Sequence, residues 1–433
     1  MTLPAFHPKR FELNDEVHAR PPQPLKSPMR LSYLVLTGGH AERDKAIEQI
    51  QDLALRFNVT PPKLDTIYTM VDMGPFRMTW ERHTEFMRYT FAVDGASEQA
   101  FDDPAINQVP DDWISALPGE LIVATHIALN RAKGKDDTGA IARGNFGSNM
   151  LLGSTILNGA ASAYTDFRIH GDGFSRFLIN DRSMSEWQAG RIVQRLLEID
   201  TYRVMALLAL PVSRELAPRL SRQERELSQI TSAMVNATEV DEPGLLDRLS
   251  RLQAAIEERH SSTHYRFSAA AAYYDIVKTR IAELREERID GLQTFDEFTE
   301  RRLAPAMNTC QAVAIRQVAL AERVARATQL LSTRVDITRE RQNQSVLESM
   351  NKRAAMQLRL QETVEGLSTA AVTYYIVGLV FYAAKAVQAA GVGIEPSLVA
   401  GLSIPPVAAF VWWGVRQVRN KMQPGDGAGD DAG

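Results

Sequence analysis

The sequence predicts an α+β N-terminal domain, followed by long, coiled-coil-like α-helices and a C-terminal hairpin of two transmembrane helices. Three observations lead to this prediction. β-rich runs recur through the first part of the chain, helical periodicity dominates the middle, and two charge-free apolar segments lie near the end. The expected parts are a cytoplasmic α+β domain (1–184), a helical or coiled-coil region (185–365), transmembrane helices 1 (366–384) and 2 (396–415), and a short, disordered cytoplasmic tail (416–433).

Composition narrows the possible functions. The 433 residues are 45% apolar and 24% charged, which is typical of a folded globular protein. The net charge of −4 excludes a general electrostatic attraction to nucleic acid, so we expect no nucleic-acid partner. Cys310 is the single cysteine, which excludes an intramolecular disulfide and a cysteine-rich zinc site and fits a reducing compartment. The N-terminus has no apolar run of signal-peptide length.

The expected strands of the α+β domain are β-rich runs separated by Gly, Pro and Asp. They read LSYLVLT, LDTIYTMVDM, EFMRYTFAV, LIVATHIAL and SAYTDFRIH. Between the first two runs, apolar residues recur at helical spacing from about Ala41 to Phe57. This mixture of strands and helix predicts the α+β class.

The middle of the chain is rich in Ala, Leu, Arg, Glu and Gln, which favour helix. Pro211 marks a helix stop, residues 241–244 mark a turn, and residues 306–363 lack Pro and Gly, as a single long helix would. An apolar seam with three–four spacing predicts coiled-coil packing and a homo-oligomer. It consists of Leu320, Val324, Ala327, Leu331 and Val335, after which polar residues weaken it.

The two C-terminal apolar segments each match the thickness of a bilayer when helical. Neither 366–384 nor 396–415 contains a charged residue, and a charge at the centre of a span costs about 2.5–3.5 kcal/mol on insertion scales. The alternative is a buried helical hairpin in a soluble domain, with Pro405 and Pro406 kinking its second helix. Basic flanks favour the membrane and a lipid bilayer as partner.

Orientation is predicted by the distribution of Lys and Arg around the two segments. Basic residues precede the first segment and follow the second, at Lys352, Arg353, Arg359, Arg416, Arg419 and Lys421. The link between the segments carries only Lys385. The positive-inside rule therefore places both termini in the cytoplasm and makes the chain a multi-pass membrane protein.

One segment, TDFRIHGDGFSRF, has the composition of a polar site. Asp166, Arg168, His170 and Asp172 alternate, so on a strand all four would project from one face. Such a group could bind a phosphate or a metal, or transfer a proton. The alternative is a solvent-facing strand with ion pairs. No catalytic residue, cofactor or bound metal is predicted.

Two further polar clusters have simpler interpretations. The cluster from Asn14 to Arg20, with Asp15, Glu16 and His18, precedes two prolines and reads as a loop. His260 and His264 lie one helical turn apart, as two metal ligands would, but no third ligand is nearby in sequence. We interpret them as an exposed pair.

Four segments carry a family resemblance: FELNDEVHARPP, TDFRIHGDGFSRFL, AGRIVQRLLEIDTYRVMALLALP and LQETVEGLSTAAVTYYIVGL. Along nearly its whole length the chain resembles an uncharacterised bacterial family, domain of unknown function 3422. The resemblance implies a bacterial inner-membrane protein and supplies no activity. In layout alone the chain is also similar to CorA-type magnesium channels. Their Gly-Met-Asn motif after the first span is missing here, where the link reads AKAVQAAGVGIE.

Three functions are compatible with these features. A membrane-anchored cytoplasmic scaffold or sensor needs the anchor, the long helices and a domain that binds a ligand or partner, and the sequence provides for all three. A CorA-like oligomeric cation channel needs in addition a selectivity element, which the sequence does not reveal. An enzyme needs a convergent site, for which residues 166–172 are the sole candidate. The first function is our prediction, and the protein partners are unknown.

Overall fold

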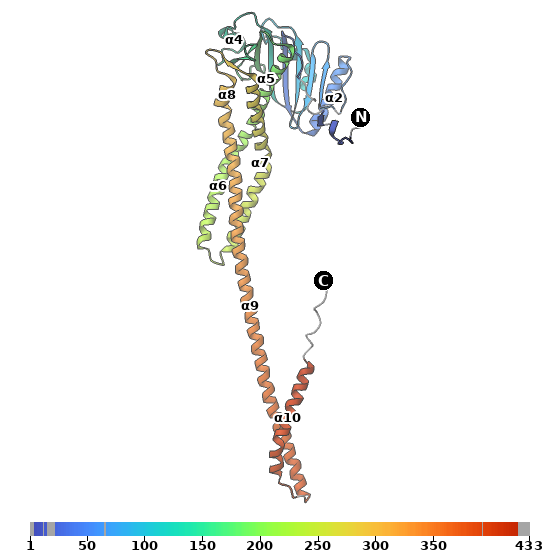
Figure 1. Ribbon diagram of the computed structural model, residues 1–433, viewed down its shortest axis with the longest axis vertical. Helices are drawn as coiled ribbons and strands as arrows, with labels where there is room; N and C mark the ends of the chain where they lie inside the picture. Colours follow the sequence, from blue (N-terminus) through green and yellow to red (C-terminus); the bar gives the residue numbers. More distant parts are fainter. Residues whose placement is uncertain (1–3, 12, 15–21, 65, 392, 423–433) are drawn as a thin grey trace. The chain divides into compact units, whose positions relative to one another are not determined.

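The computed structural model describes residues 4–11, 13–14, 22–64, 66–391 and 393–422 (Figure 1). The chain divides into two compact units. The first comprises residues 1–237 and 244–329, and the second comprises residues 238–243 and 330–433. The first contains an α/β sheet domain followed by long helices, and the second contains the apolar helices near the C-terminus.

The described residues of the first unit form a nine-stranded sheet in the order β2-β3-β4-β1-β5-β8-β7-β6-β9. Neighbouring strands are antiparallel except β5 and β8, which are parallel. The strands are β1 (Met29–Thr37), β2 (Tyr68–Asp72), β3 (Arg77–Arg82), β4 (Phe86–Asp94), β5 (Glu120–Arg131), β6 (Leu152–Ile156), β7 (Ala161–Thr165), β8 (Ser175–Asp181) and β9 (Glu287–Arg288).

One face of the sheet packs against α2 (His40–Arg56), whose apolar positions recur at helical spacing. Ile47, Ile50 and Leu53 meet the alternate residues Met87, Tyr89 and Phe91 of β4 in one buried cluster. Each such side chain contributes about 1.5–3 kcal/mol when it leaves water. The short elements η1 (Ala105–Gln108) and α3 (Asp111–Ser115) border this core, and α4 (Thr138–Asn145) lies near a smaller one.

The opposite face carries α5 (Glu186–Leu207), which begins with a capping box at Ser185. The backbone of the N-terminal segment lies directly against the start of α5, where Leu25 N donates to Glu186 O at 3.0 Å. At this crossing a Cβ atom on Gly190 would lie 1.7 Å from Gln23 O. Only glycine leaves room for the crossing backbone here.

The helices that follow α5 are interrupted at few points (Figure 1). α6 (Ala209–Asn236) begins just after α5, and Pro211 lies in its first turn, where proline is tolerated. α7 (Glu242–Leu284) begins inside the predicted turn 241–244, because the chain turns slightly earlier, at residues 239–241. Residues 285–294, which the sequence places in the helical region, contain β9 instead, and this short strand pairs with β6. α8 (Phe295–Arg302) and α9 (Ala304–Ala389) complete the series.

The predicted apolar seam of α9 is buried within the chain itself. Leu320, Val324 and Ala327 are buried in the first unit, and Leu331 and Val335 are buried as well. These side chains are therefore covered by the chain's own residues and are not exposed at the surface.

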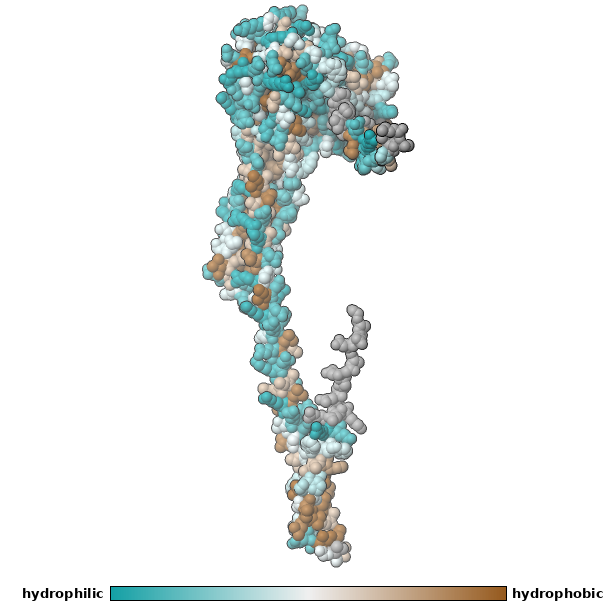
Figure 2. All heavy atoms as spheres, viewed as in Figure 1, coloured by the Kyte–Doolittle hydropathy of each residue, from teal (hydrophilic) through white to brown (hydrophobic). Residues whose placement is uncertain are grey.

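In the second unit, the end of α9 and α10 (Pro396–Met422) are both long and apolar enough to cross a membrane. Only 6% of the apolar window of either helix is buried, and Figure 2 shows brown, apolar side chains at the surface of this part of the chain. α10 continues through Pro405 and Pro406. It also includes residues 416–422, which the sequence assigns to a disordered tail, while residues 423–433 lie outside the described part.

Candidate functional site

The predicted polar segment connects β7 to β8. The sequence places Asp166, Arg168, His170 and Asp172 on one strand, but β7 ends at Thr165 and β8 begins at Ser175. The chain leaves the strand at Phe167, whose φ of 50° lies in the left-handed region. Strand alternation therefore does not apply here, and the four side chains do not share one face.

Asp166 and His170 are brought together inside this loop. The Asp166 carboxylate is fully buried, and its Oδ2 lies 3.1 Å from His170 Nε2. It also accepts hydrogen bonds from Asn149 Nδ2 at 2.7 Å and from the Arg168 backbone N–H at 3.1 Å. The latter is the bond of an Asx turn, which fixes the backbone two residues on. The carboxylate therefore holds the loop in shape.

Arg168 and Asp172 have different surroundings. The Arg168 side chain is exposed and contributes only its backbone N–H to Asp166. Asp172 accepts from Phe174 N at 3.0 Å and pairs with Arg176 of β8 at 2.8 Å. Burial opposes the charge of Asp172, but the Arg176 guanidinium lowers its pKa below the usual value. Of the four predicted residues only Asp166 and His170 pair with each other, while Asp172 pairs with Arg176.

A histidine that the sequence analysis did not single out lies beside this loop. His126 of β5 is buried, its ring stacks on Phe174 at 3.8 Å, and its Nδ1 lies 2.9 Å from Ser32 Oγ. Burial lowers the pKa of His126 to about 4. The unfolded histidine takes up a proton near its ordinary pKa of 6.5. Acidification from pH 6.5 towards pH 4 therefore favours the unfolded chain and reduces stability.

The other predicted clusters hold no site among the described residues. Of the N-terminal cluster only Asn14 is described, while Asp15, Glu16, His18 and Arg20 lie outside the described part. The rings of His260 and His264 lie 5.2 Å apart on α7. The ranges that the structure describes contain no group of three or more His, Cys, Asp or Glu side chains that could hold a metal ion.

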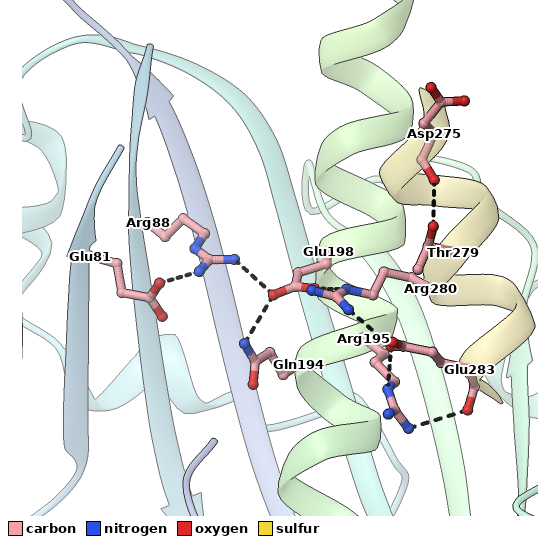
Figure 3. A network of polar contacts seen from close by, with 9 residues as sticks. All are labelled: Glu81, Arg88, Gln194, Arg195, Glu198, Asp275, Thr279, Arg280 and Glu283. Carbon is pink, nitrogen blue, oxygen red and sulfur yellow. Dashed lines mark hydrogen bonds and ion pairs between the residues drawn. The ribbon is translucent and has the colours of Figure 1, made fainter. Parts of the chain in front are cut away.

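A chain of buried charges crosses from the sheet to two helices (Figure 3). The Arg88 side chain of β4 is only 5% exposed and lies between two carboxylates. It pairs with Glu81 of β3 on one side, and its NH1 lies 3.8 Å from Glu198 Oε1 of α5 on the other. Arg280 of α7 pairs with the second oxygen of Glu198. One buried carboxylate therefore joins the strand to both helices.

The chain of charges continues toward the surface. Arg280 NH1 donates to Glu283 Oε2 at 2.9 Å, and Arg195 Nε donates to the same oxygen at 2.9 Å. Gln194 supplies a further donor to Glu198 at 2.9 Å. Positive and negative side chains alternate along this network, so each charge that is removed from water has an opposite charge beside it.

Electrostatics keeps the buried end of this network ionised. Burial alone would raise the pKa of Glu81, but the adjacent Arg88 guanidinium outweighs burial and lowers the pKa to about 2. Glu81 therefore remains a carboxylate throughout the physiological range. Its folded pKa lies below the usual value of 4.5, so its contribution to stability is present above pH 4.5 and is lost as the pH falls towards 2.

A second set of buried polar contacts fixes α5 on the same face of the sheet. Asp200 Oδ2 accepts from Thr125 of β5 at 2.7 Å and from Ser175 of β8 at 2.8 Å. The hydroxyls of Tyr33 and Thr201 lie 2.8 Å apart. Hydrogen bonds of this kind require defined positions for both partners, so they fix the register of α5 against three strands.

The cavity beside Arg88 is small. It has a volume of about 70 Å³ and lies between α5 and the sheet, lined by Tyr33, Tyr68, Glu81 and Arg88 among others. About two water molecules fit in this volume, whereas pockets for organic ligands measure about 300–1,000 Å³. The geometry suits a structural role for the charges and gives no room for a substrate.

A larger groove of about 920 Å³ lies between α7 and α9 within the first unit. Its lining mixes apolar side chains such as Phe267 and Ile315 with polar ones such as His264, Asp275 and Lys278. Its size falls in the range of ligand pockets. This groove has room for a small molecule or a peptide side chain.

The sequence did contain a signal for the buried network. In β4, Arg88 is the one charged residue within the apolar run FMRYTFAV, and it shares a face with Phe86 and Thr90. A charge on an otherwise apolar strand is either exposed or buried with a partner. The partners Glu198 and Arg280 are distant in sequence, and their pairing could not be identified without the fold.

The comparison with known proteins identifies the family. The family model described as "Protein of unknown function (DUF3422)" matches residues 5–422, nearly the whole chain. The chain belongs to the DUF3422 family. This membership agrees with the resemblance of its four sequence segments. No curated protein and no solved structure matches this DUF3422 protein.

The first testable prediction concerns the loop between β7 and β8. His170→Ala removes one donor from the buried Asp166 carboxylate, so the free energy of unfolding should fall by about 1–3 kcal/mol. The matched control is His40→Ala, which breaks an exposed i,i+4 pair with Asp44 and should change stability by less than about 1 kcal/mol. Urea unfolding followed by circular dichroism measures both. Unchanged stability in His170→Ala would contradict the structural role of this pair.

Proposed function

We propose that this DUF3422 protein is a membrane-anchored scaffold or sensor of the bacterial inner membrane. The observation that carries the proposal is the pair of apolar, charge-free segments at the end of α9 and in α10, which remain exposed in the folded chain. In this proposal they insert as an antiparallel helical hairpin. The α/β domain and the long helices then remain on the cytoplasmic side.

Exposure of these segments favours a membrane over a soluble helical hairpin. Core helices of soluble proteins can be equally long and apolar, but their residues are mostly buried. Here 6% of each apolar window is buried, and large side chains such as Leu367, Leu379, Leu402 and Phe410 are more than 60% exposed. Water is a poor solvent for such a surface, since apolar area costs about 25 cal/mol per Å². A bilayer would remove that cost.

The basic flanks support the proposed orientation. Positive charge precedes the first segment at Arg353 and Arg359 and follows the second at Arg416 and Arg419. Short loops rich in Lys and Arg remain in the cytoplasm. Both termini would accordingly be cytoplasmic, and the short link 390–395 would face the periplasm.

Two features of the first unit suit a sensor or scaffold. The charges from Arg88 through Glu198 to Arg280 join the sheet to α5 and α7. The groove of about 920 Å³ between α7 and α9 has room for a ligand or a segment of a partner. A molecule bound in this groove would contact α9, the helix that carries the first apolar segment.

The CorA-like channel is the alternative, and the lack of charged side chains in 366–384 and 396–415 argues against it. An ion pathway needs polar groups directed at the permeant ion. Thr369 and Thr373 instead donate to the carbonyls of Glu365 and Thr369 in their own helix, at 2.9 and 2.8 Å. Ser403 likewise donates to Ala400 O at 2.8 Å. These bonds use the hydroxyl hydrogens, and the oxygen lone pairs that remain are uncharged ligands at most.

The second prediction tests the anchor and its orientation. Reporter fusions at the N-terminus and after Lys421 should both report the cytoplasm, and a fusion inserted at Gln388 should report the periplasm. Removal of all residues after Glu365 deletes both apolar segments and should move the protein from the membrane fraction to the soluble fraction. A periplasmic signal at either terminus contradicts the orientation, and a truncated protein that remains in the membrane contradicts the anchor.

The third prediction separates the scaffold from the channel. Purified protein in liposomes should conduct no Mg²⁺ or other divalent cation above the level of empty vesicles, because neither segment contains a carboxylate or other charged side chain. The measurement is dye-reported Mg²⁺ influx, with a known magnesium channel as the positive control. Robust influx that disappears in Thr373→Leu would overturn the scaffold proposal.

A further inference from the structure

Part of α9 in the second unit has an uncovered apolar surface between the buried seam and the first apolar segment. Residues 339–364 are exposed without interruption. Several large apolar side chains in and next to this stretch are more than half exposed: Val346, Leu347, Met350, Met356, Leu358, Leu360, Val364 and Leu367. So many exposed apolar side chains on one helix indicate an interaction surface.

Some of these residues follow a heptad pattern, with alternating intervals of four and three residues. We call this row the α9 stripe, and it consists of Val346, Met350, Arg353, Gln357, Leu360, Val364 and Leu367. Five of the seven positions are apolar. A three–four alternation places side chains on one face of a helix and is the repeat by which helices pack as a coiled coil.

The stripe is distinct from the seam that the sequence analysis identified. That seam, from Leu320 to Val335, is buried within the chain and has no surface to offer a second molecule. The α9 stripe begins at Val346, after the polar positions Thr338, Gln342 and Ser345. The exposed stripe, and not the buried seam, is therefore the surface available for self-association.

We propose that the α9 stripe packs against the same stripe of a second copy of this chain, in parallel and in register. The argument rests on the proposed membrane anchor. Two copies inserted in one membrane in the same orientation have their first apolar segments at the same depth. Leu360 of one copy then lies at the same height above the bilayer as Leu360 of the other. A different helix in solution would have no such alignment.

The charges of the segment are compatible with this pairing. Residues 336–365 contain equal numbers of acidic and basic side chains, so two copies do not repel each other through net charge. Arg353 and Gln357 are the polar members of the stripe. In register each lies level with the same residue of the other copy, so the two Arg353 guanidinium groups repel each other while the two Gln357 amides can hydrogen-bond to each other. A polar layer inside a coiled coil fixes register at some cost in stability.

The same intervals continue into the first apolar segment. After Leu367 they reach Ala371, Tyr374 and Gly378. Small residues such as alanine and glycine allow close approach of helices in a bilayer, where van der Waals contact drives association. One continuous face would thus serve for pairing in water and in lipid.

The fourth prediction tests this pairing by disulfide formation in native membranes containing the full-length chain. Cys310 is buried and is first replaced by alanine, which leaves a chain without cysteine. Leu360→Cys then places a thiol on the stripe, and the matched control Glu362→Cys places one on the opposite face of the same helical turn. Mild oxidation should convert most of the Leu360→Cys protein to a covalent dimer and leave the Glu362→Cys protein monomeric.

The outcomes for the pairing and for the anchor are separable. Membranes are washed with alkaline carbonate before oxidation, which reports anchoring independently. Anchored Leu360→Cys protein that remains monomeric, or that forms no more dimer than Glu362→Cys protein, overturns the pairing and leaves the anchor intact. Protein released by carbonate overturns the proposed anchor. If that released protein still forms dimers only through Leu360→Cys, the stripe is supported without the membrane alignment.

Discussion

The buried guanidinium of Arg88 constrains the architecture of the whole first unit. It lies on an interior strand and is 5% exposed, so water does not compensate its charge. Removal of such a group from water costs several kcal/mol unless ionised partners are held close to it. Glu81 and Glu198 provide those partners from β3 and α5. Because Glu198 also pairs with Arg280, α7 is drawn into the same arrangement.

This constraint explains why the interface between α5 and the sheet is unusually polar. A helix held only by apolar contacts could adopt several positions on a sheet at similar energy. A helix held by paired charges and hydrogen bonds has few positions in which all partners meet. Arg88, Thr125 and Ser175 contact α5 at Glu198 and Asp200. The cavity of about 70 Å³ at this interface is too small for an organic ligand. We therefore interpret the buried charges as the joint between the sheet domain and the helices.

The fold class and several elements could be predicted from the sequence because they depend on local pattern. Strands β1, β4 and β5 coincide with β-rich runs, and α2 coincides with its amphipathic repeat. The two apolar segments near the C-terminus could be recognised from their length and their lack of charge alone. β3, β6 and β8 were missed, since their charged, polar and glycine residues hide the strand pattern. β9 depends on pairing with β6, more than 100 residues away in sequence.

The candidate polar site was harder to predict for a physical reason. Alternation between Asp166 and Asp172 implied a strand face, but the buried Asp166 carboxylate turns the chain into a loop through its bond to the Arg168 backbone. A short polar side chain can compete with a sheet for backbone donors. Likewise, the seam from Leu320 to Val335 correctly indicated an apolar face of α9, but not that the chain's own core would occupy it.

Hydrogen exchange tests most directly whether the buried charges join the sheet to the helices. In Arg88→Met the charge is lost while length and apolar volume are retained, and Glu198 loses a partner. The control is Arg30→Met on the neighbouring strand β1, which removes the partly exposed ion pair between Arg30 and Asp103. If the buried ion pairs join the sheet to the helices, Arg88→Met should accelerate amide hydrogen exchange in β4, in α5 and in α7 around Arg280. Arg30→Met should not. Faster exchange confined to β4 would contradict the joint.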